Sequence, residues 1–224
     1  MVEATRDRQN SIAVLFSGGV DSTVMLGWLL EQGRRVQPLY VRGGLIWEAA
    51  ELAAARRIVG QLRTRYAGRL AGLQVLDLPV HDLYGDHWSV TGRGVPDEQS
   101  EDAAVYLPGR NPLLLLKACL WCISREIRQI ALGTLARNPF PDARQPFFDA
   151  FELMLREATG AEIEIIRPFA RLAKQDLLVL GRQLPLTQTF SCLAPVAGAH
   201  CGRCNKCAER DQALATLAPA SAAS

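Results

Sequence analysis

Residues 17–22 combine glycines and polar side chains, in the order Ser-Gly-Gly-Val-Asp-Ser, that could hold a polyphosphate. Gly18 and Gly19 have no Cβ, so the backbone around them can approach phosphate oxygens closely. The two serines of the motif offer hydrogen-bond donors, and Asp21 offers a carboxylate of the kind that Mg²⁺ binds. The motif lacks the Gly-Lys-Ser/Thr ending of a Walker loop. We therefore predict a phosphate-binding loop of another kind, rather than a glycine turn that only caps a helix.

Four cysteines near the C-terminal end have the spacing of metal ligands. They lie within sixteen residues and include a Cys-x2-Cys-x2-Cys run: Cys192, Cys201, Cys204 and Cys207. Four thiolates suit a tetrahedral zinc ion, but similar runs occur in iron–sulfur proteins, so the spacing leaves zinc and iron open. His200 adjoins Cys201 and could substitute as a ligand, but the four cysteines already complete a site. Cys119 and Cys122 fall in an apolar segment, and we assign both to core packing.

Strand and helix patterns alternate along the chain and would position these groups. The phosphate loop follows an apolar run and precedes a segment with helical periodicity, as in a β-α unit. This alternation predicts an α/β fold, with a parallel sheet covered by helices on both faces. The predicted strands cover residues 11–16, 36–41, 73–78, 127–132 and 162–166. The predicted helices cover residues 22–30, 48–66, 111–124, 147–159 and 174–181.

The remaining segments set the expected division of the chain. Residues 81–105 lack a period and are rich in Gly, Asp, Ser and Pro, which leaves open a loop over a site or a poorly ordered segment. We expect a nucleotide-binding domain over residues 1–186 and a small cysteine segment over residues 187–212. The Ala-rich residues 213–224 are expected to be a frayed tail.

Composition narrows the functional class. The chain has 224 residues and 49% hydrophobic composition, enough for one sizeable core. A net charge of +2 is too weak to favour non-specific binding of nucleic acid. The N-terminal residues lack the apolar stretch of a secretion signal, and the longest apolar run, 113–123, is broken by Lys117 and too short to span a membrane. We expect a cytoplasmic protein without a membrane or nucleic-acid partner.

Together these segments resemble the 7-cyano-7-deazaguanine synthase (QueC/ExsB) family of PP-loop ATP pyrophosphatases, whose loop signature is Ser-Gly-Gly-x-Asp-Ser. The matching segments are residues 16–23, 107–111, 140–144 and 189–192, together with Lys174 after Pro168. The resemblance implies an adenine nucleotide alpha hydrolase-like, Rossmann-like PP-loop fold. It also implies ATP and Mg²⁺ at the loop and Zn²⁺ at the four cysteines.

The resemblance further implies a reaction and a set of site residues. ATP adenylates the carboxylate of 7-carboxy-7-deazaguanine, ammonia displaces AMP to give an amide, and a second adenylation leads to the nitrile. The implied ATP-binding residues are Phe16, Ser17, Gly18, Gly19, Val20, Asp21, Ser22, Thr23 and Leu26. The implied catalytic residues are Asp21, Asp142, Arg144 and Lys174, and the implied substrate-binding residues are Arg110, Asn111, Asp142 and Arg144.

Two segments depart from the family pattern. The family's Gly-Gln-Arg-His is here Val41-Arg42-Gly43-Gly44, and the cysteine of its Tyr-Pro-Asp-Cys-Arg is Ala143. Both are expected just past strand ends, where open α/β sheets bind their substrates, so the adenylation step is better supported than the identity of the acid. Three alternatives stay open: a tRNA-thiolating enzyme, activation of a deazaguanine or another acid for a protein partner in antiphage defence, and a nucleotide-binding scaffold without turnover. A homodimer is also left open.

Overall fold

The sheet is the centre of the computed structural model, which describes residues 10–136 and 138–216. Its five strands are all parallel and follow the order β3-β2-β1-β4-β5. The order reverses between β1 and β4, and ligands of open α/β sheets bind at the carboxyl ends of the strands beside such a reversal. The strands are β1 (Ser11–Leu15), β2 (Arg35–Arg42), β3 (Gln74–Asp77), β4 (Gln129–Ala131) and β5 (Glu164–Ile166).

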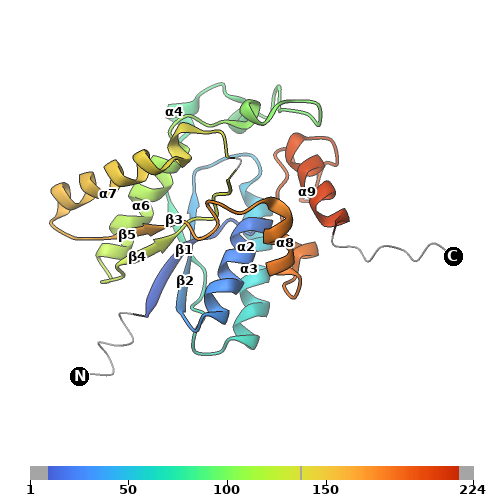
Figure 1. Ribbon diagram of the computed structural model, residues 1–224. Helices are drawn as coiled ribbons and strands as arrows, with labels where there is room; N and C mark the ends of the chain where they lie inside the picture. Colours follow the sequence, from blue (N-terminus) through green and yellow to red (C-terminus); the bar gives the residue numbers. More distant parts are fainter. Residues whose placement is uncertain (1–9, 137, 217–224) are drawn as a thin grey trace.

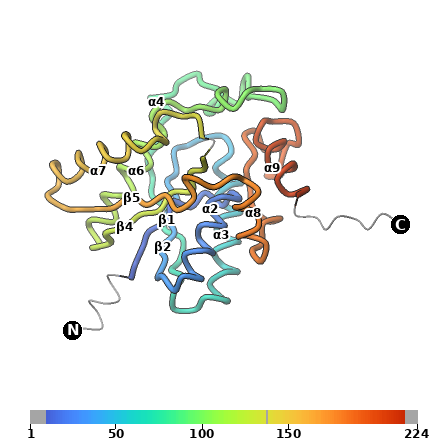
Figure 2. The backbone as a smooth tube through the Cα atoms, viewed as in Figure 1, coloured from blue at the N-terminus to red at the C-terminus, as the bar shows by residue number. Residues whose placement is uncertain are grey.

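Helices cover both faces of the sheet, which confirms the predicted architecture (Figures 1 and 2). One face packs against α2 (Val20–Glu31), α3 (Glu48–Arg65) and α8 (Lys174–Gly181). The other face packs against α6 (Arg110–Ile123) and α7 (Gln145–Thr159). The other helical elements are α4 (His81–Tyr84), α5 (Trp88–Thr91), α9 (Asn205–Ala215), and the 3-10 turns η1 (Asp102–Val105), η2 (Pro141–Ala143) and η3 (Leu186–Gln188).

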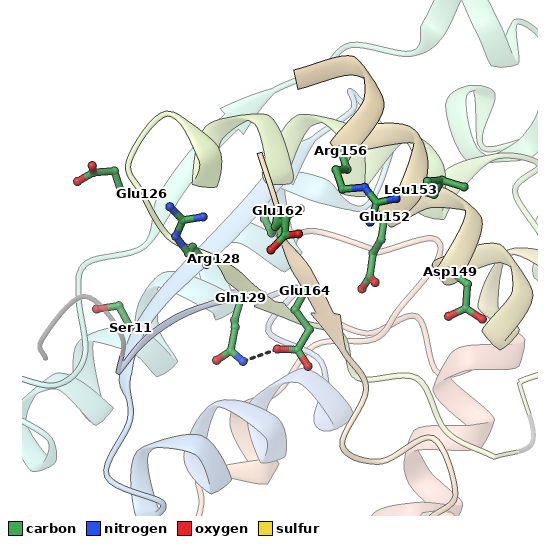
Figure 3. A pocket seen from close by; sticks show the side chains of 11 residues that line it. Ser11, Glu126, Arg128, Gln129, Asp149, Glu152, Leu153, Arg156, Glu162 and Glu164 are labelled. Atoms are coloured by element: carbon green, nitrogen blue, oxygen red, sulfur yellow. Dashed lines mark hydrogen bonds between the residues drawn. The ribbon is translucent and has the colours of Figure 1, made fainter. Parts of the chain in front are cut away.

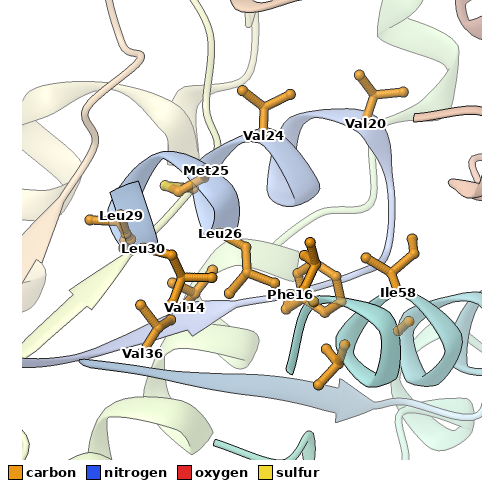
Figure 4. Packing of buried hydrophobic residues seen from close by; sticks show 14 of the residues in the cluster. Val14, Phe16, Val20, Val24, Met25, Leu26, Leu29, Leu30, Val36 and Ile58 are labelled. Carbon is orange, nitrogen blue, oxygen red and sulfur yellow. The ribbon is translucent and has the colours of Figure 1, made fainter. Parts of the chain in front are cut away.

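Alternate strand residues divide the interior into two cores. Val14 of β1 packs beneath Leu26 of α2 in the first core, which Figure 4 shows together with Ile58 of α3. Ala13, the neighbour of Val14 in β1, faces the second core. Cys119 and Cys122 of α6 are fully buried there, as predicted for cysteines that pack in a core. Each buried large apolar side chain stabilises the fold by about 1.5–3 kcal/mol. The two cores thus fix the end of β1 and the loop that follows it.

A third apolar cluster joins the segment 81–109 to the cysteine segment. Trp47 and Trp88 pack with their ring centroids 5.7 Å apart, and Leu107 and Phe190 are buried in the same cluster. Figure 2 shows the green segment beside the red α9. Of the two alternatives for residues 81–105, the structure contradicts a poorly ordered segment, because α4, α5 and η1 interrupt the loop and its apolar side chains pack against the cysteine segment.

The predicted C-terminal tail begins inside a helix. Helix α9 continues to Ala215, because Ala213 is buried and Leu214 packs against the first core. The expectation of fraying is thus wrong for residues 213–215, whereas residues 217–224 lie outside the described part of the chain. The expected domain division at residue 186 stays a prediction. Within the described residues, no helix is both long enough and apolar enough to cross a membrane.

Candidate functional site

The phosphate loop connects the end of β1 to the start of α2. Gly18 has a φ of +76°, and a Cβ at this position would lie 2.9 Å from the backbone nitrogen of Ala55, so only glycine fits. The Gly19 N–H donates to Ser17 Oγ at 3.2 Å, and Ser17 Oγ lies 3.2 Å from Ser22 Oγ. These internal bonds hold the loop in shape beside the N-terminus of α2, where free N–H groups and the helix dipole favour an anion.

Three adjoining cavities meet at this loop, with volumes of about 480, 320 and 260 Å³, and Asp21 lines all three. The smallest lies at the carboxyl ends of β1, β2 and β4 and is lined by Tyr40, Gly133 and Thr134. Thr134 Oγ1 is buried and has no hydrogen-bond partner among the described residues. An unpaired buried hydroxyl is costly unless a ligand or water pairs with it. This cavity therefore suits a ligand with polar edges, such as a nucleoside.

The cavity of 320 Å³ lies between the loop and the cysteine segment. Arg110 and Glu51 line both this cavity and the smallest one, so they stand at the boundary between the two. Small-molecule ligands usually bind between apolar walls that carry a few polar groups. Aromatic side chains in such walls can stack on the flat ring of a heterocycle. The apolar walls include Trp47, Trp88, Val105, Leu107, Phe140 and Phe190.

A chain of ion pairs crosses the site from the loop to α9. Lys174 Nζ lies 2.6 Å from Asp21 Oδ1 and 3.3 Å from Glu209 Oε1, and Lys206 Nζ lies 2.6 Å from Glu209 Oε2. Burial works to lower the pKa of Lys174, but the two carboxylates outweigh it and raise that pKa. Lys174 is therefore held as a cation beside the phosphate loop. Lys206 and Glu209 were missed in the sequence, where a lysine and a glutamate three residues apart after Cys204 are the only sign of them.

A carboxyl group that sequence reasoning also missed lies on the first turn of α3. Glu51 is partly buried, and the Tyr40 hydroxyl donates to its Oε2 at 2.7 Å. Burial raises the pKa of Glu51 to about 7, although the charge of Arg110 and the hydrogen bond from Tyr40 both lower it. The sequence shows Glu51 only as an acid near a helix N-terminus, where acids commonly stabilise the helix dipole.

The implied substrate residues divide into two pairs. Arg110 lines two of the cavities and Asn111 lines the smallest one. Asp142 Oδ2 accepts from the Asn111 N–H at 3.2 Å, and Asn111 Nδ2 donates to the Asp142 carbonyl at 2.9 Å, so Asp142 holds the start of α6. Arg144 is exposed at the start of α7. Within the described residues, neither Asp142 nor Arg144 lines any of the three cavities.

The implied ATP-binding residues also differ in position. Phe16 lines the smallest cavity, and Val20 lines the cavity of 320 Å³. Thr23 and Leu26 are fully buried on α2 and line none of the three cavities that the described residues form. Leu26 belongs to the first core, so the structure places it beneath the loop rather than at a ligand surface.

The segment that departs from the family pattern forms a specific turn. Val41 and Arg42 are the last residues of β2, which corrects the expectation that they lie past its end. The N–H groups of Gly43 and Gly44 donate to the two oxygens of Glu48, at 2.6 and 2.7 Å. The turn is thus built around a buried carboxylate, and Val41 alone of its four residues lines the smallest cavity.

The four predicted cysteines come together. Their sulfur atoms lie within 4.8 Å of one another, in the set Cys192, Cys201, Cys204 and Cys207. Metal–sulfur distances near 2.3 Å in a tetrahedron place sulfurs about 3.8 Å apart, and Cys201 Sγ lies 3.9 Å from Cys207 Sγ. The N–H of Leu193 donates to Cys204 Sγ, and a hydrogen bond of this kind stabilises a thiolate ligand. The group therefore fits a metal ion without His200, whose Nε2 accepts from the Ser191 N–H.

A further cavity, of about 780 Å³, lies at the opposite end of the sheet (Figure 3). Ser11, Gln129 and Glu164 line it, and these are the first residues of β1, β4 and β5. Five carboxylates and two guanidinium groups line this cavity, so its charge opposes the binding of phosphate. The Gln129 amide donates to Glu164 at 2.5 Å across its floor. The phosphate loop contributes nothing to it.

The chain is similar in sequence to known proteins over most of its length. Residues 11–218 match the family model described as "Queuosine biosynthesis protein QueC". The chain is 32% identical over 210 residues to 7-cyano-7-deazaguanine synthase 1 of Desulfitobacterium hafniense (strain Y51), with 92% of each chain covered. It is 33% identical over 230 residues to 7-cyano-7-deazaguanine synthase of Anaeromyxobacter dehalogenans (strain 2CP-C), covering 96% of this chain and 95% of that protein. The solved structure of NMN synthetase from Francisella tularensis has a TM-score of 0.46 and 14% identity, with 85% of this chain and 70% of that chain covered.

Proposed function

The chain belongs to the QueC family of queuosine biosynthesis proteins, and from this premise we propose that it is an ATP-dependent 7-cyano-7-deazaguanine synthase. It adenylates the carboxylate of 7-carboxy-7-deazaguanine and then uses ammonia to form the amide and finally the nitrile. The observation that carries the proposal is the pairing of Lys174 with Asp21 at 2.6 Å, on a phosphate loop beside the reversal of strand order.

In this proposal the loop and α2 bind the triphosphate. The N–H groups at the start of α2 and the Ser17 and Ser22 hydroxyls donate to phosphate oxygens, and Lys174 adds a positive charge. Asp21 would hold Mg²⁺, which neutralises triphosphate charge when it is bound. Thr134, with its unpaired hydroxyl, and the ends of β1, β2 and β4 surround the nucleoside.

The acid occupies the neighbouring cavity between the loop and the cysteine segment. Its flat ring system lies against the aromatic walls, and Arg110 orients its carboxylate toward the α-phosphorus. A carboxylate oxygen attacks that phosphorus in line, and pyrophosphate leaves. Ammonia then attacks the acyl carbon of the adenylate, and AMP leaves with the electron pair of the broken C–O bond. Asn111 and Asp142 hold the start of α6, which carries Arg110.

The four cysteines would hold Zn²⁺ and keep the C-terminal segment against the site. The close approach of their sulfurs, within 4.8 Å, supports a single tetrahedral ion, because an iron–sulfur cluster separates its thiolates over several iron atoms. Reduced thiols of this kind are maintained in the cytoplasm, which is also the compartment that we propose for the protein.

Product mass and ATP consumption test this proposal. Purified protein is incubated with ATP, Mg²⁺, 7-carboxy-7-deazaguanine and ammonium. The expected product is 7-cyano-7-deazaguanine, with pyrophosphate released at each adenylation and AMP released when each adenylate reacts further. Omission of the acid should abolish ATP consumption. Pyrophosphate release without amide or nitrile would point instead to another acceptor, such as a protein amine, and the absence of acid-dependent ATP consumption would refute the proposed activity.

A further inference from the structure

Glu51 lies where the two ligand cavities meet. It shares with Arg110 the boundary between the cavity at the strand ends and the cavity beside the cysteine segment. The Tyr40 hydroxyl donates to Glu51 Oε2, and Oε1 accepts no hydrogen bond from the described residues. By contrast, Glu48, one turn earlier on α3, uses both oxygens to hold the turn after β2.

We infer that the Glu51 carboxylate accepts a proton from the ammonia nitrogen when that nitrogen attacks the acyl-adenylate. This inference rests on the proposed function. If the nucleoside fills one cavity and the acid fills the other, the acyl phosphate forms between them, and Glu51 and Arg110 are the charged side chains that line both cavities outside the phosphate loop. The Arg110 guanidinium can bind the anionic substrate, and the Glu51 carboxylate can accept a proton from ammonia.

The step balances without any further reactant. The lone pair of ammonia forms the C–N bond, the C–O bond to AMP breaks, and its electron pair leaves on the phosphate oxygen. One N–H proton passes to Glu51, which gives a neutral amide and a protonated carboxyl group. Conversion of the amide to the nitrile removes the two remaining N–H protons, one when the amide oxygen is adenylated and one when AMP leaves. Glu51 can accept each of them after it releases the previous proton to solvent.

The surroundings of Glu51 support a base that works near neutral pH. The groups that face it are Tyr40 on β2, Glu48 on its own helix and Arg110 on α6, while Asp21 and Lys174 line the same cavity from α2 and α8. Burial raises the pKa of Glu51 to about 7, against the lowering by Arg110 and Tyr40. A base with a pKa near the working pH transfers protons most effectively.

The test measures adenylation and the attack of ammonia separately in the variant Glu51→Gln. Acyl-adenylate formation is followed by trapping with hydroxylamine, which is unprotonated at neutral pH and a stronger nucleophile than ammonia. Amide and nitrile are followed with ammonium. We expect hydroxamate formation to stay within about threefold of wild type and the ammonia reaction to fall on the order of 10²-fold. Glu162→Gln, the same change at the opposite end of the sheet, is the matched control and should leave both reactions unchanged.

The pH profile distinguishes a base from a structural partner of Tyr40. The wild-type rate, expressed per concentration of unprotonated ammonia, should rise with pH through about 7, and Glu51→Gln should lack this rise. Tyr40→Phe removes a hydrogen bond that lowers the pKa of Glu51, so its rise should move to higher pH. Glu51→Asp should recover part of the ammonia reaction.

Three results would overturn the inference. An ammonia reaction in Glu51→Gln within about threefold of wild type would show that no proton transfer depends on this carboxylate. Equal loss of hydroxamate and amide would assign Glu51 to adenylation or to packing. Wild-type protein that forms no hydroxamate with 7-carboxy-7-deazaguanine would refute the proposed function itself, and the inference with it.

Discussion

The two ends of the sheet both carry cavities, but they differ in what converges on them. At the carboxyl ends of the strands, three cavities of about 260 to 480 Å³ share Asp21 and meet a helix N-terminus. At the amino ends, a cavity of about 780 Å³ is lined by five carboxylates, which come from α7, β5 and the segments before β4 and β5. Volume therefore does not locate the function, whereas convergence of donors and cations on one loop does.

The difference follows from the topology of a parallel sheet. Every strand presents its carboxyl end on the same side, and the first helix begins there with free N–H groups that favour anions. Lys174 and Arg110 add positive charge at that end. The amino end has five carboxylates against two guanidinium groups, so a polyphosphate would be repelled.

The strongest test of this comparison is Asp21→Asn against Asp149→Asn. Asp21 is the carboxylate common to the three cavities, and loss of its metal-binding charge should lower the rate of pyrophosphate release on the order of 10³-fold. Asp149 lines the cavity at the opposite end, and its substitution should change that rate less than about twofold. Similar losses in the two variants would break the distinction between the ends.

Lys174→Met should have the next largest effect, on the order of 10²-fold on pyrophosphate release. The substitution keeps the length of the side chain but removes the cation that lies between Asp21 and Glu209. Steady-state kinetics with ATP as the varied substrate measure the loss. An unchanged kcat with a raised KM would restrict Lys174 to ground-state binding, and unchanged kinetics would remove it from the mechanism.

Cys204→Ser should act on stability more than on chemistry. Structural zinc contributes roughly 10–16 kcal/mol of binding free energy to small folds, and loss of one ligand should lower the melting temperature on the order of 10 °C. Because Cys204 caps α9, hydrogen exchange should rise in α9 before it rises in β1. Metal analysis accompanies both measurements. Loss of metal without any change in melting or exchange would contradict a structural role.

The smallest expected effect is on the pH dependence of stability. Because the pKa of Glu51 is raised from 4.5 to about 7 in the folded protein, the folded state binds this proton more tightly than the unfolded state does. Its contribution to stability is thus lost as pH rises from about 4.5 to about 7. The melting temperature of the wild-type protein should therefore fall over this window, and in Glu51→Gln this fall should be smaller by a few degrees. Glu162→Gln should keep the wild-type slope, and an equal slope in all three proteins would contradict the assignment.

The sequence predicted features that are local and missed those that packing assembles. The phosphate loop is contiguous, and its neighbouring strand and helix have clear periods, so its place at the end of β1 was predictable. Glu51, Thr134 and Glu209 reach the same site from α3, the end of β4 and α9, and no spacing in the sequence connects them.

The differences between expectation and structure have the same cause. Asp142 and Arg144 lie two residues apart in a matched segment, but Asp142 contacts the start of α6 and Arg144 is exposed, and their implied catalytic and substrate-binding roles stay predictions. The segment 81–105 lacks a period because its short helices are held by contacts with the cysteine segment rather than by their own pattern. Ala213 belongs to a helix because of a neighbouring core that its Ala-rich context does not reveal.

The most direct test of the central claim is exchange of labelled pyrophosphate into ATP without ammonia, since this reports acyl-adenylate formation alone. The account predicts exchange that requires 7-carboxy-7-deazaguanine, is lost in Asp21→Asn and persists in Asp149→Asn. Exchange that is absent with this acid in the wild-type protein, or that falls equally in both variants, would contradict adenylation of this substrate at the carboxyl end of the sheet.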